Sequence, residues 1–161
     1  MAGIKDIYAI FKEVADAYSA IADIRYDKTY NINGSVSQEY PLILIDSMPD
    51  FKTQEARQGS GYKAIKKEYK LKVFFYDNFW MSEKETTALQ EKQDAMQQIF
   101  ERYLGEVQKR MLEGNTGIVF LGRENDGFFG TSEATGGQRV MMYETIRVLA
   151  PLDCTTGTFT Y

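Results

Sequence analysis

Apolar and polar residues alternate most regularly over residues 66–76 of the chain. Lys70 and Lys72 point to one side of this stretch, and the other side is apolar. The apolar side consists of Tyr69, Leu71, Val73 and Phe75. A period of two residues is typical of a strand with one face in the core, so the sequence predicts a half-buried strand here.

A long stretch with helical spacing follows this strand. Its apolar residues recur mostly at steps of three and four, namely Leu89, Met96, Ile99, Phe100, Tyr103, Leu104, Val107 and Met111. Ser82 and Glu85 form a capping box, and Gly114 suits the left-handed conformation just past a helix end. We therefore expect one helix over 83–113, about 45 Å long at a rise of about 1.5 Å per residue.

Shorter patterns predict the remaining elements. Apolar residues at helical spacing predict an amphipathic helix over 4–22. Weak alternation predicts a short strand over 24–30, and the apolar run 41–46 predicts a strand buried on both faces. The runs 117–121 and 139–150 predict the last two strands.

Together these elements predict an α+β fold in the order α-β-β-(long loop)-β-α-β-β. Neither the first strand described nor the long helix can bury its apolar face alone, so we expect a mainly antiparallel sheet with both helices packed on one face. A length of 161 residues with 43% hydrophobic residues fits one domain, which we place at 1–150. The remaining residues, 151–161, form a C-terminal tail. Its last seven residues, TTGTFTY, have a high β propensity that suits extension of a sheet edge or contact with another subunit.

The segment 49–65 joins two predicted strands that a few residues could have joined. Loops this long are unusual in compact domains and are commonly functional. Phe51 and Tyr62 within it are possible anchors, so we predict a protruding β-arm. The alternative is a surface insertion with these two aromatic rings packed onto the body.

Charge is unevenly distributed along the chain. Residues 50–72 carry seven Lys or Arg against three Asp or Glu, although the whole chain has a net charge of −4. A basic loop can bind nucleic acid, but the acidity of the other residues favours contact with protein or solvent. We therefore expect Lys52, Arg57 and Lys63 of the arm to face acidic neighbours.

Two further aromatic pairs lie in segments without a hydrophobic pattern. Phe128 and Phe129 interrupt the polar, glycine-rich loop 123–138, and Phe159 and Tyr161 lie in the tail. Adjacent exposed aromatic residues need a partner, either the edge of the domain's own core or another chain. The predicted protein interface is therefore made of Phe51, Lys52, Arg57, Tyr62, Lys63, Phe128, Phe129, Phe159 and Tyr161.

The composition closes several classes of chemistry. The chain has no histidine and one cysteine, Cys154, so it offers neither a Ser-His-Asp triad nor a soft-metal ligand set. Its carboxylates do not follow a calcium-loop spacing, and its glycines do not form a phosphate loop. Glu144 is the one acid in an apolar strand face, and we expect Lys70 or Lys72 to pair with it. We predict no catalytic, cofactor-binding or metal-binding residues, and no apolar run approaches the ~20 residues of a membrane span.

The order and texture of these elements resemble the tail terminator and head-tail connector (neck) proteins of long-tailed bacteriophages. The resemblance lies in the N-terminal helix, the strand EYPLILIDS, the strand YKLKVFFYD after a long loop, the capped helix, and a glycine and aromatic loop that leads into RVMMYETIRVL. It covers roughly residues 4–150.

Such a resemblance implies a structural virion protein and not an enzyme. The subunit would assemble with itself into a ring, usually a hexamer, that terminates the tail tube or joins tail to head. The implied partners are the tail tube protein on one side and a connector or adaptor protein on the other. DNA would pass through without sequence-specific binding, no membrane would be involved, and the protein would be made in the bacterial host cytoplasm.

Other functions compatible with the sequence are a different tail-completion or adaptor protein, an enzyme using carboxylate, Tyr or Ser chemistry, and a small-ligand-binding α+β domain. The enzyme would need a deep pocket with titratable groups. The ligand carrier would need Phe74, Tyr76, Phe79 and Trp80 to line a cavity between helix and sheet.

Overall fold

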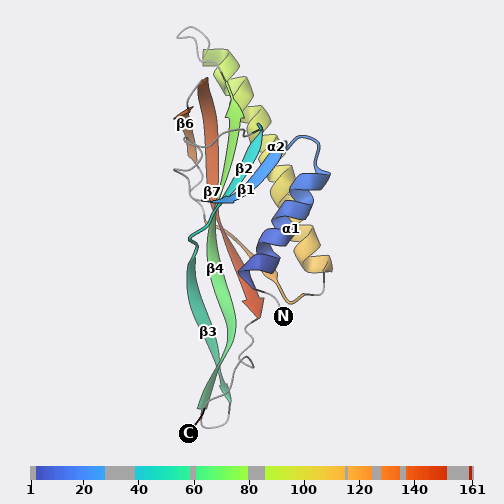
Figure 1. Ribbon diagram of the computed structural model, residues 1–161, viewed down its shortest axis with the longest axis vertical. Coiled ribbons are helices and arrows are strands. Elements are labelled where there is room, and N and C mark those ends of the chain that lie inside the picture. Colours follow the sequence, from blue (N-terminus) through green and yellow to red (C-terminus); the bar gives the residue numbers. More distant parts are fainter. Residues whose placement is uncertain are drawn as a thin grey trace.

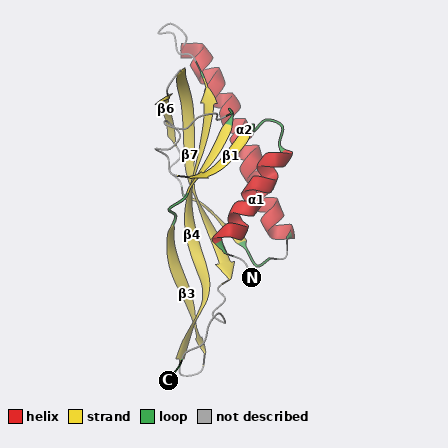
Figure 2. Cartoon of the chain, viewed as in Figure 1, coloured by secondary structure: helices red, strands yellow, loops and turns green. Residues whose placement is uncertain are grey.

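The chain forms two layers, a twisted sheet and two helices that pack on one of its faces (Figures 1 and 2). The computed structural model describes residues 3–27, 39–58, 61–79, 86–114, 116–124, 128–134, 137–151 and 160. The elements in chain order are α1 (Ile4–Ala17), β1 (Asp23–Asp27), β2 (Leu42–Asp46), β3 (Asp50–Gln58), β4 (Gly61–Asn78), α2 (Thr86–Glu113), β5 (Val119–Arg123), β6 (Phe128–Ala134) and β7 (Gly137–Pro151). The α+β class predicted from the sequence is confirmed.

Two long strands, β4 and β7, form the centre of the seven-stranded sheet. They pair antiparallel from Lys66 opposite Pro151 to Asn78 opposite Arg139. Strands β2 and β3 pair with successive parts of the outer edge of β4, and β6 and β5 share the outer edge of β7 in the same way. Strand β1 adds to β2 in parallel, and every other pair is antiparallel. The sheet is therefore mainly antiparallel, as predicted.

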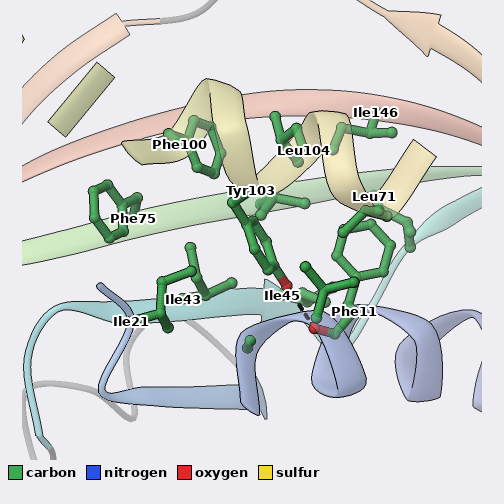
Figure 3. Packing of buried hydrophobic residues seen from close by; sticks show 14 of the residues in the cluster. Phe11, Ile21, Ile43, Ile45, Leu71, Phe75, Phe100, Tyr103, Leu104 and Ile146 are labelled. Carbon is green, nitrogen blue, oxygen red and sulfur yellow. Dashed lines mark hydrogen bonds between the residues drawn. The ribbon is translucent and has the colours of Figure 1, made fainter. Parts of the chain in front are cut away.

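The main core lies between the sheet and the two helices. Phe75 of β4 stacks on Phe100 of α2 with ring centroids 5.8 Å apart, and both side chains are fully buried. Tyr103 of α2 reaches across to α1, where its hydroxyl donates a hydrogen bond of 2.7 Å to the carbonyl oxygen of Phe11 (Figure 3). Because Tyr103 is fully buried, this bond satisfies a polar group that would otherwise be costly.

A second, smaller cluster lies on the opposite face of the sheet. Leu42 and Leu44 of β2 and Tyr76 of β4 are its buried members. Ile43 and Ile45 point the other way, into the main core, so β2 is buried on both faces as predicted. Burial raises the pKa of Tyr76 to about 12.

Most of the segment 49–65 is a β-hairpin, which agrees with the predicted protruding β-arm and corrects the long loop in the predicted element order. Strand β3 starts at Asp50, and β4 starts at Gly61 instead of at residue 66. The β3 residues pair with β4 from Asp50 opposite Lys70 to Gln58 opposite Gly61. Sequence periodicity did not give the bounds of its two strands because the hairpin projects beyond the helices, where a strand can form without a regular apolar pattern.

The polar segment 123–138 also contains strand structure that the sequence did not predict. Strand β6 begins at Phe128, and β7 begins at Gly137. These residues pair with each other across a short connection, from Phe128 opposite Tyr143 to Ala134 opposite Gly137. The backbone of the long strand β7 provides the partner groups, so this mostly polar segment forms a strand without an alternating apolar pattern.

The helix ends differ from the predictions in two places. Helix α1 ends at Ala17 and not near residue 22, although Ile21 is still buried in the core from the following turn. Gly114 does not adopt the left-handed conformation, which Gly117 takes instead with a φ of 79°. Ser82 and Glu85, the predicted capping box, lie outside the described residues.

Glu144 pairs with Arg123, and the predicted pairing with Lys70 or Lys72 is wrong. Arg123 of β5 lies 3.2 Å from Glu144 and 2.6 Å from Glu101 of α2. Glu144 lies on the helix side of β7, whereas Lys70 follows the opposite face, where it meets Glu124 at 2.8 Å. Burial raises the pKa of Glu144, while the charge of Arg123 lowers it and that of Glu101 raises it.

This environment predicts a pH dependence of stability. The folded pKa of Glu144 is above its ordinary value of 4.5, so its contribution to stability is most favourable below that value and is lost as pH rises through the folded pKa. Glu144→Gln should therefore gain stability relative to the native chain as pH rises through this window. Urea unfolding across the window measures the difference. Parallel stability profiles for the two proteins would contradict the prediction, and Glu101→Gln controls for the loss of a carboxylate beside Arg123.

Candidate assembly surface

The β3–β4 hairpin is the feature of the fold that the core does not explain. Strand β7 accompanies β4 only from Lys66 onward, so among the described residues β3 is the only strand that pairs with residues 61–65 of β4. Figure 1 shows this hairpin extending past the helices at the end of the sheet opposite β6. We call residues 49–65 the arm, and its base lies against residues 66–70 of β4.

The helix-side face of the arm carries an exposed aromatic ring at its base. Phe51 is 63% exposed, and its ring lies 6.5 Å from that of Tyr69 on the neighbouring strand. The Lys67 ammonium lies 4.5 Å from the centre of the Phe51 ring and donates a hydrogen bond of 2.5 Å to the Thr53 hydroxyl. The Phe51 ring is therefore held in place on a paired strand. Less conformational entropy is then lost when a partner binds this ring.

The opposite face of the arm base is charged. Glu68 is buried between Lys52, whose ammonium is 2.8 Å from Oε2, and Arg147 of β7, 3.5 Å from Oε1. The Lys52 contact is an ion pair without hydrogen-bond geometry at that oxygen. Because an unpaired buried carboxylate is strongly unfavourable, the two cations tie the arm base to the body.

A shallow polar cleft of about 180 Å³ lies beside this ion pair. Its walls are formed by Asp46, Met48, Pro49, Asp50, Lys70, Lys72, Glu124 and Thr145. The hydrogen bond from Lys70 lowers the pKa of Glu124. The cleft mixes both signs of charge, so its composition suits polar contact with another protein surface.

The structure gathers five of the nine predicted interface residues on the arm. Phe51 and Lys52 lie at its base, and Arg57 faces Tyr62 across the hairpin, with Lys63 next along β4. For the latter three, the structure describes the backbone and not the side chains.

The other four predicted residues are not brought to the arm. Phe128 and Phe129 lie on β6, at the far end of β7, where the Phe129 side chain is 38% exposed. Phe159 and Tyr161 lie outside the described residues.

Sequence reasoning missed an apolar strand edge on the other side of the sheet. Val119 and Leu121 of β5 are 37% and 38% exposed. Strand β5 is the last in the order β1-β2-β4-β7-β5, so its outer edge faces no other strand in the described part of the chain. The run of apolar residues over 117–121 was visible in the sequence, but an edge position could not be told from a central one.

Two sets of residues bear on the other functions considered. Within the described ranges, no group of three acidic or Cys side chains could hold a metal ion.

The aromatic residues considered for a ligand cavity lie on different faces of the sheet. Phe74 belongs to the small cluster on the outer face, whereas Phe79 packs against the main core and Trp80 lies outside the described residues. These aromatic residues therefore do not line one cavity.

No helix in the described part of the chain combines the length and apolar character needed to cross a bilayer. A scan against protein-family models finds no match for this chain, and a search of curated proteins finds none either.

Proposed function

We propose that this protein is a structural subunit that assembles with copies of itself into a ring through its arm. The observation that carries the proposal is the arm itself, a paired hairpin that projects from a complete core and presents Phe51 at 63% exposure. A projecting hairpin adds little to the core of its own subunit. A neighbouring subunit could bury its exposed ring and pair its free strand edge.

Charge supports a copy of this chain as the partner. Most of the arm lies within residues 50–72, which contain seven basic and three acidic residues. The whole chain has a net charge of −4. A basic arm and an acidic body attract each other between copies, and such complementarity steers association and fixes orientation. A contact between two different surfaces of identical subunits is head-to-tail, and it closes into a ring when the rotation permits.

We place this ring at the neck or tail end of a long-tailed bacteriophage, because the element order of the sequence resembles the proteins found there. In that setting the ring has six subunits, terminates the tail tube or joins it to the head, and contacts the tail tube protein on one side and a connector on the other. DNA passes through its centre without sequence-specific contacts. The mainly antiparallel α+β fold is compatible with this setting, and the exposed Phe51 supplies an assembly contact.

The ring is tested by sedimentation velocity and negative-stain electron microscopy of the purified chain over a concentration series. We expect a single closed species in addition to monomer, with ring-shaped particles whose number of subunits is constant. An antibody against the chain should label one end of the tail in particles that encode it. A chain that stays monomeric at its highest attainable concentration would contradict self-assembly, and label elsewhere on the particle would contradict the neck position.

A further inference from the structure

We propose that the arm recognises a second copy of this chain by pairing the outer edge of β3 with the outer edge of β5 of that copy. The inference rests on the proposed ring and identifies the surface that receives the arm. The two sheets would then become one continuous antiparallel sheet across the subunit boundary.

The outer edges of β3 and β5 lie at the same position along the strand direction of the sheet, which we call the same height. One row runs across four strands from Asp50 through Lys70 and Arg147 to Gly122. The next row runs from Phe51 through Tyr69 and Val148 to Phe120, and a third runs from Lys52 to Val119. In this half of the sheet β3 and β5 are therefore the two outermost strands of the order β3-β4-β7-β5.

The strand directions also match. Each neighbouring pair in this four-stranded half is antiparallel, so β3 and β5 run in opposite directions. Copies placed side by side in the same orientation bring β5 of one copy against β3 of the next as an antiparallel pair. The new pair would be antiparallel, like the three strand pairs in this half of each subunit.

Strand β5 carries no lysine or proline on its free edge, although it is short and has a bulge between Phe120 and Gly122. Its sequence is VFLGR, and Val119 and Leu121 are exposed. Its one charged residue, Arg123, forms ion pairs with Glu101 and Glu144. An apolar edge without lysine or proline is a site where another strand can add.

The pairing would also place exposed aromatic surface where it can be buried. At equal height, Phe51 of one copy comes beside Phe120 of the next, since both lie in the same row on the helix side of the sheet. Aromatic pairs in neighbouring strands stabilise a sheet beyond the area they bury.

The remaining free edges fit the arm less well. Strand β1 is level with residues 73–76 of β4, and β6 is level with residues 74–78, both away from the arm. Pairing β3 with either one would shift each copy along the strand direction. Such a shift repeats from copy to copy and gives an open helical array in place of a closed ring.

Cysteine crosslinking tests the pairing in the full chain. The parent carries Cys154→Ser, which removes the only native cysteine. One protein then carries Lys52→Cys in β3, together with Glu68→Gln so that no buried carboxylate loses its lysine, and a second carries Val119→Cys in β5, which lies in the same row. Mixed under mild oxidation, the two should give disulfide-linked dimers, and a chain with both cysteines should give a ladder that ends at the ring.

Two control positions make the result specific. Leu112→Cys lies on α2, where Leu112 is more exposed than Val119, and Arg25→Cys lies on the β1 edge. We expect at least about tenfold more crosslinking of Lys52→Cys to Val119→Cys than to either control. Equal yields, or a preference for β1, would overturn the β3–β5 pairing.

A charge placed on the β5 edge provides a second test. Val119→Lys adds a lysine to an exposed position, so the subunit should fold as before while self-association weakens by at least about tenfold. Leu112→Lys is the matched control and should associate like the parent. Unchanged association of the Val119→Lys protein would overturn the pairing.

The outcomes separate the two proposals. Rings that form without β3–β5 crosslinks overturn this pairing and leave the ring standing. A parent chain that remains monomeric at every concentration overturns both.

Discussion

Replacing Phe100 by alanine is expected to lower the free energy of unfolding by about 3 to 5 kcal/mol. Phe100 is fully buried, and its ring is parallel to that of Phe75 within 1°. The change removes a stacked aromatic contact between α2 and β4 and leaves a cavity that rigid neighbours cannot fill (Figure 3).

Urea unfolding followed by circular dichroism measures this loss. Gln98→Ala, on the exposed side of the same helix, is the control and should change stability by less than about 0.5 kcal/mol. A loss below about 1 kcal/mol for Phe100→Ala would mean that the helix does not anchor the sheet through this ring.

Replacing residues 52–65 with a flexible Gly-Ser linker is expected to abolish assembly while the body still folds. The linker keeps every β4 residue from Lys66 onward, and these are the residues that pair with β7. The buried members of both hydrophobic clusters lie outside the replaced segment. The variant loses most of the outer edge of β3, which the ring requires.

The buried Glu68 determines how this variant must be designed. Removal of Lys52 would leave the carboxylate with Arg147 alone, so the variant should also carry Glu68→Gln. Glu68→Gln in the full-length chain is the matched control. Melting temperature and sedimentation velocity are measured on both proteins.

Two results would contradict the expectation for the arm. If the shortened protein has no cooperative melting transition, the arm belongs to the folding core. If it assembles like the control, the arm is a surface insertion, which was the alternative left open by the sequence.

The elements that face the core were largely predictable from the sequence. The alternation around Leu71, Val73 and Phe75 predicted β4, and the helical spacing through Phe100 predicted most of α2. Both patterns arise because an apolar face must be buried, and burial repeats every two residues in a strand and about every 3.6 in a helix. The α+β class follows from these elements.

Elements without a regular apolar pattern could not be predicted in the same way. Strands β3 and β6 are mostly polar in sequence, and they pair with the long edges of β4 and β7, which provide backbone partners for them. Their side chains therefore carry no periodic signal. The sequence identified Phe51 and Lys52 as candidates, but not the strand that holds them.

The sequence by itself determined which residues line the core, that β4 and α2 must pack together, and that the arm segment is basic and aromatic. Only the tertiary structure decided that Glu144 meets Arg123 and that Phe51 and Phe120 lie in one row across the sheet. The physical reason is that the apolar or polar character of each residue indicates whether that residue is buried. Ion-pair partners and the height of a strand edge depend instead on the register between strands far apart in the chain.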